Sequence, residues 1–167
     1  DAINDSNTIT SNVTKMGGGC GYDWSVLRGA NEIVKSNGKS SGGVMSFIGI
    51  FDAILDGVMQ GGARRGAGMS QLNVNHPDIL KFITAKKDLS KYTRSNFSVR
   101  MYDDFYETLL SNPNEIFYTE NITDKQLNPL VKDDGSFYTY QDLWNLIIDM
   151  AWLMAEPGIF NKTIDMK

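Results

Sequence analysis

Four basic side chains in two glycine-rich loops are the residues whose types and spacing suit chemistry best. Arg28 and Lys35 lie in the first loop, and Arg64 and Arg65 lie in the second. Fourteen of the sixteen glycines fall between residues 17 and 68, and glycine lets a main chain approach a phosphate closely. An arginine fork binds phosphate bidentately, while lysine supplies a point charge. The pattern indicates a nucleotide with several phosphates, although four solvated surface cations would give the same spacing.

The single cysteine and the single histidine are weaker candidates for chemistry. Cys20 stands among glycines with no histidine near it in sequence, which is more typical of a small apolar residue than of a nucleophile. His76 precedes Pro77, a setting that favours a capping or packed residue over a general base. One cysteine and one histidine cannot build a metal site unless carboxylates supply most of the ligands, so we expect no metal.

Helix and strand patterns alternate around the two loops, which span about residues 28–43 and 60–68. Periodic apolar residues predict helices over 5–16, 44–60, 77–83, 103–110 and 140–154. Strand patterns cover 22–27, 69–74, 96–101 and 116–119. This alternation predicts an α/β sheet or barrel, and we expect residues 1–167 to form a single partial domain. In the last helix we expect Trp144, Met150, Trp152 and Met154 to belong to the core.

Composition and charge exclude several classes of protein. The 167 residues are 41% hydrophobic and 22% charged, as in an ordinary globular domain and unlike a disordered chain. The net charge of −4 provides no basic field for nucleic acid. No run of about 18 apolar residues is present, so we expect no membrane span, and the lone cysteine suits a reducing cytoplasm. The start lacks an initiator Met and a secretory signal, so we expect a piece of a longer chain.

Several segments, taken together and in order, resemble the large (catalytic) subunit of ribonucleotide reductase. They are GGGCGYDWS at 17–25, SGGVMSF at 41–47, QGGARRGA at 60–67, HPDI at 76–79, NFSV at 96–99 and EPGI at 156–159. Such collinear blocks over most of the chain are far more specific than any single glycine motif.

The resemblance implies a fold and a reaction. The family fold is a ten-stranded α/β barrel of two parallel five-stranded halves, and this chain would supply part of the first half-barrel. The family reduces ribonucleoside diphosphates or triphosphates to deoxyribonucleotides by thiyl-radical chemistry at the 2′ carbon. Its reactive cysteines would lie before residue 1 and beyond residue 167, so the resemblance puts no catalytic residue in this fragment, which alone should be inactive. Cys20 stands where relatives carry Thr, Val or Ile and receives no role.

The resemblance also implies binding residues. For the substrate they are Gly18, Gly19, Arg64 and Arg65, and for the allosteric effector they are Asp1, Arg28 and Lys35. The specificity loop between the two ligands would comprise Gln60, Gly61, Gly62, Ala63, Gly66 and Ala67. Flexible glycines at 61, 62 and 66 would let that loop adopt several poses.

Cofactors and partners follow from the same resemblance. The double arginine and the EPGI segment are most similar to the adenosylcobalamin-dependent class, and a di-iron or di-manganese radical subunit is the alternative. ATP or deoxynucleoside triphosphates would be effectors. Further partners would be the ribonucleotide substrate, a thioredoxin-type reductant, the remainder of the reductase chain and, as one option, a second copy in a homodimer. Two other functions stay open: a non-catalytic nucleotide-binding regulatory module left as a split-subunit remnant, and an α/β interaction domain with turn glycines.

Overall fold

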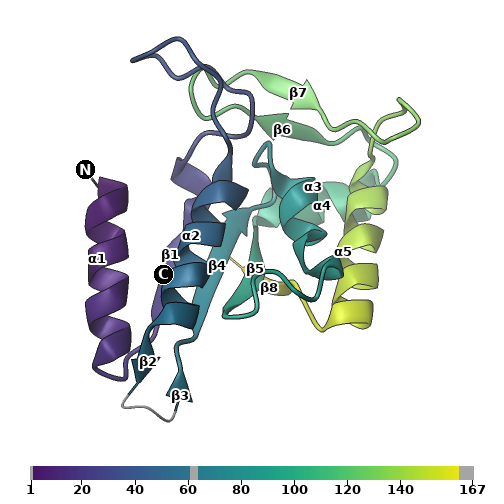
Figure 1. Ribbon diagram of the computed structural model, residues 1–167. Coiled ribbons are helices and arrows are strands. Elements are labelled where there is room, and N and C mark those ends of the chain that lie inside the picture. Colours follow the sequence, from purple (N-terminus) through teal and green to yellow (C-terminus); the bar gives the residue numbers. More distant parts are fainter. Residues whose placement is uncertain (1, 61–63, 162–167) are drawn as a thin grey trace.

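A computed structural model describes residues 2–60 and 64–161 (Figure 1). The helices are α1 Ala2–Lys15, α2 Val44–Gly57, α3 Ile79–Ile83, α4 Asp103–Ser111 and α5 Tyr140–Met154, with short 3-10 helices η1 Trp24–Val26 and η2 Ala85–Lys87. The strands are β1 Cys20–Asp23, β2 Met59–Gln60, β3 Arg64–Arg65, β4 Gly68–Asn73, β5 Ser95–Met101, β6 Tyr118–Glu120, β7 Leu127–Pro129 and β8 Gly158–Asn161. No helix of this described part is long and apolar enough to cross a membrane.

Four parallel strands form the main sheet in the order β1-β4-β5-β8. Each strand pairs with the next main-sheet strand along the chain, and at least one helix lies in every connection. Connections between parallel strands of one sheet are right-handed in almost all proteins, and successive connections in one direction put their helices on one face of the sheet. The structure therefore confirms the α/β class and fits part of a singly wound barrel.

The two faces of the sheet differ in chemistry because side chains alternate along each strand. Leu72 and Val99 are fully buried and belong to the core that α2, α3 and α5 complete. On the opposite face, Arg100 of β5 forms an ion pair with Asp23 of β1, reaching across β4. A parallel sheet is usually apolar on both faces, so a polar face marks the side on which ligands or other polar groups can be received.

A buried carboxylate organises the carboxyl-terminal edge of this sheet. Asp78, only 3% exposed, accepts the main-chain N–H of Ala30 at 3.1 Å and of Val44 at 2.9 Å. It therefore caps the amino end of α2 from a distant segment and closes both ends of the 30–44 stretch. Gly43 permits this approach, because its φ of 77° suits glycine and a Cβ there would overlap the carboxylate.

Several element boundaries differ from the sequence-based predictions. The 22–27 strand is wrong: β1 ends at Asp23, whose carboxylate accepts the N–H of Ser25 at 3.0 Å and starts η1. The 60–68 loop contains the short antiparallel pair β2–β3. The 116–119 strand becomes β6, which pairs with β7, a strand that the sequence did not predict.

The last helix exposes Trp152, which was expected in the core. Trp152 is 88% exposed and Leu153 is 66% exposed, whereas Leu143, Ile147 and Met150 are buried. An apolar pattern that surrounds a helix cannot tell which face a neighbour covers, and here only one face packs on the core.

We predict that Asp78→Ala lowers the free energy of unfolding by about 3 kcal/mol, because it leaves two buried N–H donors without an acceptor. Urea denaturation followed by tryptophan fluorescence measures this. Asp88→Ala is the control, since Asp88 accepts from Ser90 in an exposed turn, and its unfolding midpoint should stay unchanged. Equal midpoints for the two variants would contradict the role given to Asp78.

Candidate functional site

The structure brings together Arg28 and Lys35, two of the cations that the sequence singled out. Both line one cavity of about 310 Å³, whose other walls are Val26, Leu27, Ile122 and Thr123. The cavity lies beyond the carboxyl end of β1, between the 28–43 loop and the turn that joins β6 to β7. Ligands of α/β sheets bind at this end of the strands.

The two cations are held differently. Arg28 is half-buried, and its Nε–H donates to Thr123 Oγ1 at 3.2 Å. Within the described residues its Nη groups have no hydrogen-bond partner. Lys35 is exposed. Hydrogen bonds from Gln126 and Asn121 lower the pKa of the Asp124 carboxyl, and the charge of Lys35 lowers it further. A fixed guanidinium beside a mobile ammonium suits an extended polyanion, because one supplies geometry and the other supplies charge.

A second cavity of about 250 Å³ adjoins the first, and the two share Val26 and Leu27 as lining residues. It lies between α1 and η1, and its lining is mainly apolar, with Ile3, Trp24 and Phe47 among it. The indole Nε1 of Trp24 is buried and has no hydrogen-bond partner among residues 2–60 and 64–161. A ligand that fits both cavities would carry a flat or apolar portion and an anionic portion, as a nucleoside triphosphate does. Asp1 lies outside the described residues.

The other predicted residues within the described part of the chain lie at the opposite, amino-terminal end of the strands (Figure 1). Gly19 directly precedes β1, and a Cβ on it would lie 3.4 Å from the carbonyl oxygen of Ala67, directly before β4. Gly18 donates its N–H to Val13 at 3.0 Å, and a Cβ there would lie 2.7 Å from Val13 Cγ1. The structure thus places Gly18 and Gly19 beside the end of the 60–67 segment.

Gly66 is closely packed: it is buried, and a Cβ there would lie 2.8 Å from the carbonyl oxygen of Leu55. It is a glycine because α2 packs against its backbone. Its flexibility stays a prediction. Strand β2 contains Gln60, and strand β3 consists of Arg64 and Arg65. The described residues do not include Gly61, Gly62 and Ala63.

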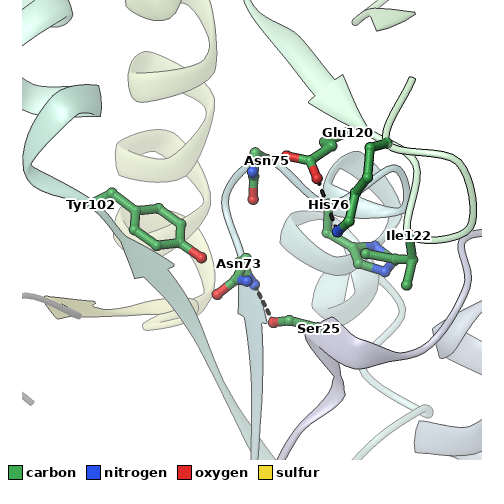
Figure 2. A pocket seen from close by; sticks show the side chains of 8 residues that line it. Ser25, Asn73, Asn75, His76, Tyr102, Glu120 and Ile122 are labelled. Atoms are coloured by element: carbon green, nitrogen blue, oxygen red, sulfur yellow. Dashed lines mark hydrogen bonds and ion pairs between the residues drawn. The ribbon is translucent and has the colours of Figure 1, made fainter. Parts of the chain in front are cut away.

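Sequence reasoning missed a polar pocket of about 230 Å³ at the carboxyl ends of β4 and β5 (Figure 2). Figure 2 shows the side chains of Asn73 and Asn75 and the hydroxyl of Tyr102 turned toward one space. Asn73 Oδ1 is buried, and no other residue in the described part of the chain forms a hydrogen bond with it. Glu120 and Lys125 pair at 3.0 Å at the rim. The available signal was position: polar residues directly after a buried strand of a parallel sheet.

His76 lines this pocket, but both of its ring nitrogens form hydrogen bonds with the main chain. It is 1% exposed. Its Nδ1 accepts the N–H of Asp78 at 3.0 Å, so Nε2 carries the proton and donates to the carbonyl of Leu27 at 2.9 Å. Burial lowers the pKa of His76 despite the opposing effects of the Leu27 carbonyl and nearby carboxylates. The structure supports a packed histidine and leaves no nitrogen for general-base chemistry.

Glu32, which is 8% exposed, is a second buried carboxylate. It lies near the cavity lined by Arg28 and Lys35, hereafter the cationic cavity. Glu32 accepts the N–H of Gly29 at 2.7 Å and of Thr123 at 3.0 Å. Burial alone would raise its pKa, but these main-chain hydrogen bonds outweigh burial and lower the pKa of the Glu32 carboxyl. It therefore stays charged and links the 28–43 loop to the β6–β7 turn.

Residues 2–60 and 64–161 contain no group of three or more His, Cys, Asp or Glu side chains able to hold a metal ion. Cys20 is a free, half-buried thiol that packs against the core, as expected for a small apolar residue.

Comparison with known proteins gives a consistent result. The family described as "Ribonucleotide reductase, barrel domain" matches residues 1–164. The vitamin B12-dependent ribonucleoside-diphosphate reductase of Thermoplasma acidophilum is 39% identical over 160 residues, covering 95% of this chain and 20% of that protein. The enzyme of the same description from Mycobacterium tuberculosis H37Rv is 40% identical over 153 residues, covering 90% and 20%. The ribonucleoside-diphosphate reductase subunit alpha of Chlamydia muridarum is 25% identical over 186 residues, covering 97% and 18%. The chain therefore spans about a fifth of the length of these relatives.

We predict that acid weakens the fold through His76. Because its folded pKa lies below the ordinary value of 6.5, its stabilising contribution is complete above pH 6.5 and is lost as pH falls toward the folded pKa. Urea midpoints at pH 7.5 and 5.5 test this against His76→Gln, which retains an Nε donor and cannot titrate. The parent should lose more stability than the variant over this interval, and equal losses would contradict the assignment.

Proposed function

Since the chain belongs to the ribonucleotide reductase barrel-domain family, we propose that it carries the nucleotide-binding part of a reductase catalytic subunit. The whole protein would convert ribonucleoside diphosphates or triphosphates to deoxyribonucleotides, with its reactive cysteines outside this chain. The work of the chain is to hold an effector nucleotide at one end of the strands and the substrate at the other.

One observation carries this proposal: the cationic cavity of Arg28 and Lys35 adjoins the apolar cavity of Trp24 and Phe47. The first suits the phosphates of an ATP or deoxynucleoside triphosphate effector, and the second suits its nucleoside. Asp1 would contact the effector sugar, a role supported by the neighbouring Ala2 and Ile3, which line the apolar cavity.

Substrate binding is proposed at the amino-terminal end. There Gly18 and Gly19 would lie against the ribose, and Arg64 or Arg65 would reach its base or phosphate. The close approach of Gly19 to Ala67 supports this, because it sets the specificity loop beside the two glycines. Gln60, Gly61, Gly62, Ala63, Gly66 and Ala67 would transmit the identity of the effector to the substrate.

We also propose adenosylcobalamin as the cofactor of the whole protein, supported by relatives named vitamin B12-dependent. Adenosylcobalamin supplies the radical in such enzymes. Both ring nitrogens of His76 are engaged in hydrogen bonds, so this histidine is not free to ligate cobalt.

The proposed partners are a thioredoxin-type reductant, the rest of the reductase and a second copy of the chain, in the cytoplasm. Exposed apolar side chains on α1, directly after α1 and on α2 support association with another copy. Ile9 is 56% exposed, Met16 is 81% exposed and Ile50 is 47% exposed, and burying such residues is favourable.

We predict that Arg28→Ala and Lys35→Ala each raise the dissociation constant of dATP about tenfold in the full-length reductase, because each removes a charge-assisted contact with phosphate. Isothermal titration calorimetry measures this. Lys39→Ala is the matched control, since Lys39 lies in the same loop but does not line the cavity, and its affinity should equal the parent's. Parental affinity in both cavity variants would refute the effector site.

We predict that Arg64→Ala or Arg65→Ala weakens effector-dependent substrate choice more than thermal stability, because the two side chains are proposed to contact ligand rather than core. The measurements are product ratios from mixed ribonucleotides with and without effector, and the melting temperature. Unchanged effector dependence in both variants would rule out this role.

A further inference from the structure

One wall of the cationic cavity, which is lined by Arg28 and Lys35, comes from a distant part of the chain. Residues 121–125 join β6 to β7, and the main chain closes this turn with hydrogen bonds from Asn121 N–H to Gln126 at 2.9 Å and from Lys125 N–H to Asn121 at 3.1 Å. Ile122 and Thr123 line the cavity with Arg28 and Lys35. Figure 1 shows the β6–β7 arm beside the 28–43 loop at the same end of the molecule. The cavity depends on how these two segments are held together.

Glu32 holds them together. Its carboxylate accepts the N–H of Gly29 at 2.7 Å from the loop, and those of Thr123 at 3.0 Å and Ile122 at 3.4 Å from the turn. Each of these donors would be costly to leave unpaired away from water. The carboxylate therefore fixes the separation of the turn from the residue that follows Arg28.

Thr123 in turn orients Arg28. Its hydroxyl oxygen accepts the Arg28 Nε–H at 3.2 Å, which restrains the long side chain in one direction. The Nη groups have no partner among the described residues, so they are available to an anion. A restrained fork loses less entropy on binding than a free one, which raises affinity without adding a contact.

We propose that the 121–125 turn is a functional wall of the nucleotide site, in which Thr123 orients Arg28 toward the phosphates and Glu32 is a positioning residue. This inference rests on the proposed effector site and deepens it. The ligand class is a nucleoside triphosphate. Glu32 does not touch the ligand, because its oxygens are occupied by main-chain donors.

The test is calorimetric titration of dATP into the full-length reductase and its variants. Thr123→Ala removes the acceptor for Arg28 and should raise the dissociation constant about fivefold, whereas Thr123→Ser keeps a hydroxyl and should bind within about twofold of the parent. Glu32→Gln replaces one carboxylate oxygen with an amide NH₂, which would face main-chain N–H donors, and it should weaken dATP binding about tenfold. The comparison of Ser with Ala at 123 isolates the hydroxyl, which accepts from Arg28 and also bonds to Glu32. Thr123→Ala should therefore cause no further loss of affinity in an Arg28→Ala background, whereas a merely structural role would still lower affinity there.

Asp134→Ala is the matched control, in the turn that follows β7. Its carboxylate accepts the N–H of Ser136 at 2.9 Å in a turn away from the cavity, so affinity should stay at the parental value. Parental binding by Thr123→Ala, or equally weak binding by both Thr123 variants, would overturn the inference even if Glu32→Gln fails to fold. If Arg28→Ala also binds dATP like the parent, the proposed effector site itself is wrong and the inference falls with it.

Discussion

The carboxyl-terminal end of the main sheet depends on buried carboxylates that accept main-chain N–H groups. The 28–43 loop has almost no secondary structure, so its polar backbone must find partners elsewhere. Asp78 accepts from Ala30 and Val44, and Glu32 accepts from Gly29 and from the β6–β7 turn. These bonds offset the cost of burying two charges, and they fix an irregular segment where regular pairing cannot.

The cavities follow from this arrangement. With the loop fixed at both ends, Arg28 faces Thr123 on one side, and Val26 and Leu27 separate the cationic cavity from the apolar one. At the opposite end of the strands the constraint is different, because glycines there let α1, α2 and the strands approach closely. One end is therefore organised by charge and hydrogen bonds, and the other by the absence of side chains.

Much of the fold could be predicted because it is local in sequence. Apolar periodicity located α2 and α5, and alternation of helices and strands gave the α/β class. Loop composition and the family resemblance both singled out Arg28 and Lys35, which line one cavity. Glu32, Asn73 and Asn75 were missed because their importance comes from partners or neighbours far away in the chain, as in the contact of Glu32 with Thr123. Trp152 was misplaced because an apolar residue on a helix carries no information about which neighbour covers it.

A crystal structure of the full-length protein with dATP bound is the most direct test of the proposed effector site. We expect triphosphate oxygens within hydrogen-bonding distance of Arg28 and Lys35, with the nucleoside in the cavity lined by Trp24 and Phe47. Density for the nucleotide at another place, with both cavities holding only water, would contradict this expectation.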